Sequence, residues 1–135
     1  MKISKLDLEP KVIDFLTSEG YKELFEPQEQ SVKAGLFDDK KNFLITIPTA
    51  SGKTLIAMLA ILSHLSKYKT KIIYLTPLRA LTSEKFEEFK KLEKLNLGRK
   101  IKVALSTGDS KEKKEKLEDA DVIFLTNESM DANMA

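Results

Sequence analysis

Seven consecutive residues have the types and order that a phosphate-binding loop requires: Pro48, Thr49, Ala50, Ser51, Gly52, Lys53 and Thr54. Gly52 would let the backbone approach a phosphate group without the clash that a Cβ atom causes, and Lys53 supplies a cation that can reach β- and γ-phosphates. The hydroxyl of Thr54 can bind Mg²⁺, and the free N–H groups of a helix that starts here would attract anions. These residues predict a site for a nucleoside triphosphate and its magnesium ion.

The loop departs from the common phosphate-loop pattern at one position, because Ile47 stands where a first glycine is expected. The alternative interpretation is an ordinary turn between a strand and a helix that contains Gly-Lys-Thr by chance. The flanking segments favour the phosphate loop. A short β-prone run over 43–47 precedes it and an apolar helical pattern over 54–65 follows it, which is the context that the motif needs.

Strand and helix patterns alternate along the rest of the chain, with no internal repeat and no linker. Such alternation indicates βαβ units, and hence an α/β fold whose parallel sheet has helices on both faces. We expect one domain over 1–135, with a helical region over 1–40 and a βαβ core over 41–135. The predicted helices span about 8–19 (capped by Asp7), 27–36, 54–65, 81–92 and 111–118, and the predicted strands span 43–47, 72–75, 101–105 and 122–125.

Parallel strands bring their carboxyl ends to one rim of the sheet, and ligands of such sheets bind there. In this chain four loops follow predicted strands and would line that rim: 48–54, 76–79, 106–109 and 126–128. The charged run over 111–116 is more typical of a solvated helix face than of a nucleic-acid patch.

The composition excludes several classes of function. The 135 residues include no cysteine, which rules out a disulfide framework, a thiolate zinc site and a cysteine nucleophile. The apolar run over 55–62 is too short to cross a bilayer and no signal peptide is visible, so we predict a cytoplasmic protein without a membrane contact.

The net charge of +2 neither demands nor excludes a nucleic-acid partner. Abundant Lys and Glu with few amides favour a thermophilic source. His64 has no neighbouring ligand and is expected to be structural.

Five stretches together resemble the motifs of superfamily 2 DExH-type helicases. The loop at 48–54 reads like motif I of the Ski-like branch, which often lacks the first glycine. The four other stretches are Leu24-Phe25-Glu26-Pro27-Gln28 (the Q motif), Thr76-Pro77-Leu78-Arg79-Ala80-Leu81 (motif Ia), Ser106-Thr107-Gly108-Asp109, and Thr126-Asn127-Glu128-Ser129-Met130-Asp131. The chain looks most like the archaeal DNA-repair helicases of this branch, and the resemblance covers essentially its whole length.

The resemblance implies a P-loop NTPase fold, the N-terminal RecA-like lobe, and roles for particular residues. Gln28 would bind the adenine edge through both atoms of its amide, which would select ATP. Phe25 would lie near the base or, as an equal alternative, anchor the core. The residues implied to contact the backbone of single-stranded DNA (or RNA) without reading bases are Pro77, Arg79, Thr107, Gly108, Thr126 and Glu128.

Two departures from the family pattern limit what the segment can do. Ser129 stands where the family usually has lysine. Motif II, Asp-Glu-x-His, is absent, and Asn127-Glu128 as a degenerate version would lack the aspartate that holds Mg²⁺. We therefore expect an incomplete lobe that stops before motif II and is inactive alone, since hydrolysis needs those acids and arginines from a second RecA-like lobe.

The leading hypothesis is thus the N-terminal ATP-binding segment of an ATP-dependent DNA helicase, which couples ATP hydrolysis to movement along a single strand. Three alternatives remain open at this point. They are an RNA helicase of the same branch, another P-loop NTPase such as a small kinase or GTPase, and a truncated fragment that only binds nucleic acid or a partner.

Overall fold

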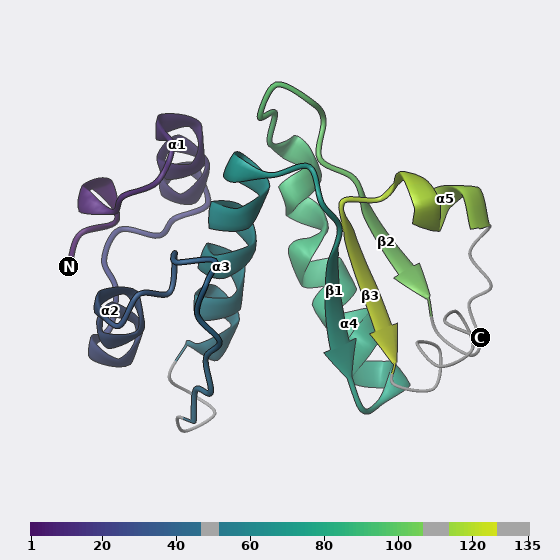
Figure 1. Ribbon diagram of the computed structural model, residues 1–135, viewed down its shortest axis with the longest axis horizontal. Coiled ribbons are helices and arrows are strands. Elements are labelled where there is room, and N and C mark those ends of the chain that lie inside the picture. Colours follow the sequence, from purple (N-terminus) through teal and green to yellow (C-terminus); the bar gives the residue numbers. More distant parts are fainter. Residues whose placement is uncertain (47–51, 107–113, 127–135) are drawn as a thin grey trace. The chain divides into compact units, whose positions relative to one another are not determined.

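The computed structural model describes residues 1–46, 52–106 and 114–126. The chain forms two compact units, Met1–Tyr68 and Lys69–Ala135, and each is described by itself below (Figure 1). Within the described ranges, no helix has both the length and the apolar character needed to span a membrane.

The first unit is helical. It contains the short 3-10 helix η1 (Ile3–Lys5) and the helices α1 (Pro10–Ser18), α2 (Glu26–Lys33) and α3 (Lys53–Lys67). The i, i+3, i+4 spacing in α1 predicts one apolar face, and its three members are buried: Val12, Phe15 and Leu16. The helix starts at Pro10, because proline has a helical φ and lacks only an N–H that has no partner in the first turn. The predicted cap at Asp7 is therefore wrong, and Glu9 holds the N-cap position.

The predicted strand over 43–47 is wrong for the residues that the structure describes. Residues 43–46 belong to no helix or strand, and the Leu44 side chain is 94% exposed. A strand forms only where a neighbouring strand accepts its N–H groups and donates to its carbonyls. No such neighbour pairs with this segment within the described residues, so its β propensity and apolar side chains do not suffice.

The second unit contains a parallel sheet. Its elements are β1 (Ile72–Thr76), α4 (Arg79–Phe89), η2 (Lys90–Lys94), β2 (Val103–Ser106), α5 (Lys114–Asp119) and β3 (Val122–Thr126). The strand order is β1-β3-β2, and β3 pairs in parallel with both neighbours. The three strands predicted in this unit, over 72–75, 101–105 and 122–125, and the parallel α/β class are confirmed, with strand boundaries shifted by one or two residues.

A helix packs against each face of this sheet around β3. On one face Phe124 of β3 packs against the rings of Tyr74, Phe86 and Phe89, and two of these three come from α4. On the other face Ile123 and Leu125 of the same strand form a cluster with Ala104, Ala120 and Leu117 near α5. Because successive side chains of a strand point to opposite faces, α4 and α5 lie on opposite sides of β3, as Figure 1 shows.

Candidate nucleotide-binding loop and strand-end rim

Gly52 begins α3 in a conformation that favours glycine. Its φ of 78° and ψ of 33° lie in the left-handed region, and it occupies the N-cap position of the helix. Its carbonyl accepts a hydrogen bond from Nε2 of Gln28 at 3.2 Å. A Cβ atom added at Gly52 would lie 2.0 Å from that nitrogen, which no real contact allows. The backbone angle therefore favours glycine here, and a Cβ atom would fit only if the Gln28 amide moved away.

Lys53 and Thr54 form the first turn of α3, and the N–H groups and dipole at the start of a helix favour an anion. The Lys53 side chain is exposed and borders a cavity of about 320 Å³, and Thr54 is half-buried. The four residues before Gly52, Pro48 to Ser51, lie outside the described residues. The structure thus places the glycine, the cation and the hydroxyl of the predicted loop on one helix start.

Gln28 is 2% exposed and sits at the third position of α2. Its Oε1 accepts a hydrogen bond from the backbone N–H of Phe25 at 2.7 Å, while its Nε2 binds Gly52. An amide side chain has two donor hydrogens and two acceptor lone pairs, and these two hydrogen bonds use one of each. Phe25 is 67% exposed, which contradicts the core-anchor interpretation and leaves it on the surface beside Gln28.

The link between Gln28 and Gly52 was not foreseen from the sequence. The other hydrogen bond of Gln28, to the N–H of Phe25, has a recognisable sequence signal, because a glutamine at the third helical position commonly binds back to the N-cap N–H. The usual companion signal, a Ser, Thr, Asp or Asn at the N-cap, is missing since Phe25 holds that position. The contact with Gly52 spans 24 residues of sequence and has no local pattern.

In the second unit, the three strands end on one rim as predicted. Thr76 of β1 lies in register with Thr126 of β3, and Ser106 of β2 lies opposite Leu125. The turn after β1 is fixed by hydroxyl groups: the Thr76 and Thr82 hydroxyls lie 3.2 and 3.0 Å from the Leu78 carbonyl oxygen and also contact each other. Their two hydrogens serve two of these three contacts at a time. This network sets where α4 begins.

Of the predicted nucleic-acid contacts, Pro77 and Arg79 are exposed at this rim, and Arg79 is the first residue of α4. Thr126 is also at the rim but only 3% exposed, so its side chain offers little surface. Thr107, Gly108 and Glu128 lie outside the described residues. No cluster of three or more His, Cys, Asp or Glu side chains in the described part of the chain could hold a metal ion.

His64 lies beside Asp39 and Tyr68 in the first unit. Its Nδ1 lies 3.6 Å from Oδ1 of Asp39, and its ring lies 5.0 Å from that of Tyr68. Lys67 pairs with the same carboxylate. Desolvation raises the pKa of Asp39, but a hydrogen bond from Tyr68, followed by the charges of Lys67 and His64, outweighs it and lowers the pKa.

Comparison with known proteins gives a consistent result. Over 132 residues the chain is 44% identical to the ATP-dependent DNA helicase Hel308 of Pyrococcus horikoshii, covering 98% of this chain and 18% of that protein. Over 128 residues it is 45% identical to Hel308 of Methanocaldococcus jannaschii, covering 90% of this chain and 10% of that protein. The chain therefore spans less than a fifth of the length of these relatives.

Solved structures share the fold. S. cerevisiae Dbp5 bound to RNA and ADP BeF3 superposes with a TM-score of 0.81 at 21% identity, over 98% of this chain and 34% of that one. A hypothetical ATP-dependent RNA helicase from Sulfolobus tokodaii gives a TM-score of 0.72 at 23% identity, over 94% of this chain and 36% of that one. The fold is that of a RecA-like helicase lobe. Residues 25–135 match the DEAD/DEAH box helicase family, and the chain belongs to it.

Proposed function

We propose that this chain is the N-terminal ATP-binding segment of an ATP-dependent DNA helicase that moves along a single strand. The observation that carries the proposal is the start of α3, where a left-handed Gly52 precedes Lys53 and Thr54. The position that a Cβ atom would take at Gly52 is occupied by the Gln28 amide, whose Nε2 would lie 2.0 Å from that atom. The 42–45% identity to proteins named as ATP-dependent DNA helicases supports the choice of DNA.

The residues of this helix start fit ATP with Mg²⁺. Lys53 would bind the β- and γ-phosphates, the first-turn N–H groups would receive phosphate oxygens, and Thr54 would bind the metal. When bound, the metal neutralises charge that develops on the phosphates. Gln28 would read adenine with its remaining donor and acceptor. The preceding residues Pro48 to Ser51 complete the proposed cradle.

Hydrolysis requires more than this segment contains. The sequence has no Asp-Glu-x-His motif, and a transition state for phosphoryl transfer also needs positively charged side chains around it. In the full-length protein we assign the acids to a motif II strand and the arginines to a second RecA-like lobe. The segment by itself is proposed to bind nucleotide without turnover.

The strand-end rim is the proposed track for nucleic acid. Arg79 would pair with a phosphate, and Pro77, Thr107, Gly108, Thr126 and Glu128 would line the path of the backbone. Contacts of this kind position a strand without reading its sequence. They also do not by themselves read the 2′-hydroxyl that separates RNA from DNA.

The proposal is tested by measuring hydrolysis of ATP and of GTP by the full-length protein, with single-stranded DNA, single-stranded RNA or neither. We expect ATP turnover to rise with DNA and to exceed GTP turnover. Stimulation by RNA alone would favour an RNA helicase of the same branch. Equal rates of GTP and ATP hydrolysis would contradict the proposed contact between Gln28 and adenine and would favour another class of P-loop NTPase.

Arg79→Ala in the full-length protein is expected to weaken binding to single-stranded DNA of any sequence. Loss of one phosphate contact should reduce the slope of log K against log salt by roughly 0.7–1. The measurement is a salt titration followed by fluorescence anisotropy of a labelled oligonucleotide. Lys85→Ala is the matched control, because Lys85 lies on the same helix and pairs with Glu88 at 3.1 Å. An unchanged slope for Arg79→Ala would place this residue off the track.

A further inference from the structure

Strand β2 has an outer edge with backbone groups that no strand uses. Within the described residues β2 pairs only with β3. In a parallel pair, alternate residues direct their N–H and C=O groups to opposite sides of the strand. The Val122 N–H donates to the Lys102 carbonyl, so Lys102 and Ala104 face β3, while Val103 and Leu105 face outward. The edge therefore offers donors and acceptors at the spacing of a strand.

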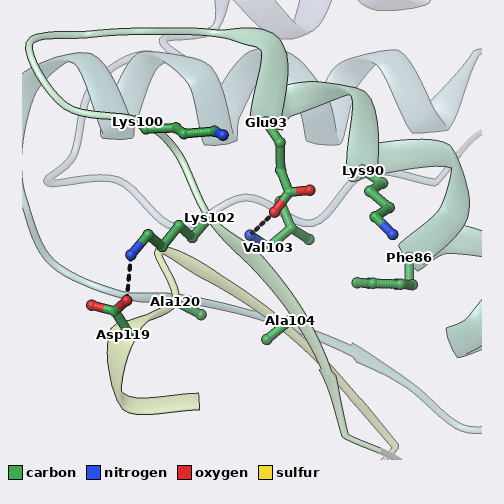
Figure 2. A pocket seen from close by; sticks show the side chains of 9 residues that line it. All are labelled: Phe86, Lys90, Glu93, Lys100, Lys102, Val103, Ala104, Asp119 and Ala120. Atoms are coloured by element: carbon green, nitrogen blue, oxygen red, sulfur yellow. Dashed lines mark hydrogen bonds and ion pairs between the residues drawn. The ribbon is translucent and has the colours of Figure 1, made fainter. Parts of the chain in front are cut away.

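A cavity of about 510 Å³ lies along this edge. Figure 2 shows Phe86, Lys90 and Glu93 on one side of it, from α4 and η2, and Asp119 and Ala120 on the other side. Its apolar walls come from Phe86, Val103, Ala104 and Ala120, of which all but Phe86 are buried residues. The cavity thus combines an apolar socket with the outward N–H groups of β2.

The acidic side chains around the cavity have partners, whereas two of its lysines form no ion pair within the described residues. The two acids are both engaged, since Asp119 pairs with Lys102 and Glu93 accepts from the Val103 N–H at 3.3 Å (Figure 2). The ion pair raises the pKa of Lys102 and lowers that of Asp119. Lys90 and Lys100 are exposed and form no ion pair within the described residues, although the Lys90 ammonium lies 5.6 Å from the centroid of the Phe86 ring. The cavity therefore carries uncompensated positive charge.

We propose that this cavity, with the outer edge of β2, binds an extended acidic segment of a partner protein. The segment would add to β2 as a further strand, with its backbone on Val103 and Leu105. Alternate side chains would enter the apolar socket, and its carboxylates would pair with Lys90 and Lys100. A nucleic-acid strand fits this edge less well, because the outward N–H and C=O groups of β2 match the alternating donors and acceptors of a peptide backbone, whereas the phosphates of a nucleic acid offer only acceptors.

Glu93 competes with such a segment. Its carboxylate occupies the Val103 N–H, which an incoming strand would need. Charged side chains at a sheet edge are a common defence against unwanted strand pairing. The partner segment would therefore have to displace the Glu93 carboxylate from the Val103 N–H, and a substitution that removes this carboxylate should tighten binding of the segment. This inference stands on the second unit alone and does not depend on the proposed ATP site.

The test uses the full-length protein and a fluorescein-labelled peptide of ten residues that alternates Glu and Val. We expect saturable binding by anisotropy, weakened at least tenfold by Lys90→Glu with Lys100→Glu and tightened by Glu93→Ala. Lys40→Glu is the matched control, since Lys40 is an exposed lysine of the first unit. A peptide with Lys in place of Glu should not bind. Hydrogen exchange at the Val103 and Leu105 amides should slow when the acidic peptide is bound.

Several results would overturn the proposal. Absence of binding to the wild type and to Glu93→Ala, or binding that the two lysine substitutions leave unchanged, would do so. Amides of β2 that exchange at the same rate with and without peptide would exclude strand addition. If the charge reversals weaken binding of a single-stranded oligonucleotide and leave binding of the peptide unchanged, the edge is a nucleic-acid site and the proposal is wrong. Lys100→Gln removes the charge without reversing it and should weaken binding of the peptide to an intermediate degree. An unchanged affinity would count against the proposal.

Discussion

Lys53→Ala in the full-length protein is expected to lower ATP hydrolysis by at least about 100-fold, the usual loss when a group that stabilises transition-state charge is removed. Lys53 is the exposed cation at the start of α3, and the adjacent N–H groups cannot replace a mobile ammonium group on the γ-phosphate. Binding of single-stranded DNA should be largely retained, because the proposed contacts for the strand lie on other residues. Steady-state ATP hydrolysis and anisotropy with a labelled oligonucleotide measure the two effects.

Lys40→Ala is the control for this substitution. Lys40 is an exposed lysine of the same unit, so the variant loses the same charge away from the helix start. We expect wild-type turnover from it. Wild-type turnover from Lys53→Ala would instead show that this loop does not hold the reacting phosphates.

Gly52→Ala is expected to abolish measurable ATP binding and to destabilise the first unit. A non-glycine residue at φ 78° costs roughly 1–2 kcal/mol. The new Cβ would also force Gln28 away from the Gly52 carbonyl, which strands polar groups of a buried side chain at a cost of about 1–3 kcal/mol. Thermal unfolding and calorimetric titration with ATP and magnesium measure the two consequences.

Two further variants separate the backbone cost from the clash. Gly20 also has a positive φ, of 95°, but a Cβ there would meet nothing within 4 Å, so Gly20→Ala should show the backbone cost alone. In Gly52→Ala combined with Gln28→Ala the three atoms of the described residues that lie nearest to the new Cβ are gone, so the double variant should be less unstable than the two single effects added together. If Gly52→Ala is no worse than Gly20→Ala, the contact with Gln28 has no energetic weight.

The sequence predicts best where a local pattern and burial agree. The run at 122–125 is apolar throughout, as a strand covered on both faces should be, and β3 is buried at every position. The spacing of Val12, Phe15 and Leu16 predicts the buried face of α1 for the same reason. The alternation of strands and helices then suffices to predict the parallel pairing, because a helical crossover returns the chain in the same direction.

The failures have a different cause. The segment 43–47 has the composition of a strand, but pairing is decided by a neighbour and not by composition, and residues 43–46 are unpaired here. The Gln28–Gly52 hydrogen bond joins a helix and a loop that are far apart in sequence. For the site, residue types identified Gly52, Lys53 and Thr54, whereas the dependence of Gly52 on Gln28 emerged only from the three-dimensional arrangement.

The position of β3 has a consequence for synthesis on the ribosome. Within the described residues β1 and β2 meet only through β3, which is the last of the three to be made. From Thr76 to Val122 there are 46 residues, so β1 would wait roughly 2–10 s for its partner at usual elongation rates. During that interval the backbone groups of β1 and the Tyr74 ring, which packs against Phe124 of β3, are available to neighbouring nascent chains. We expect chaperone occupancy on polysomes to be highest just before residues 122–126 emerge from the ribosome.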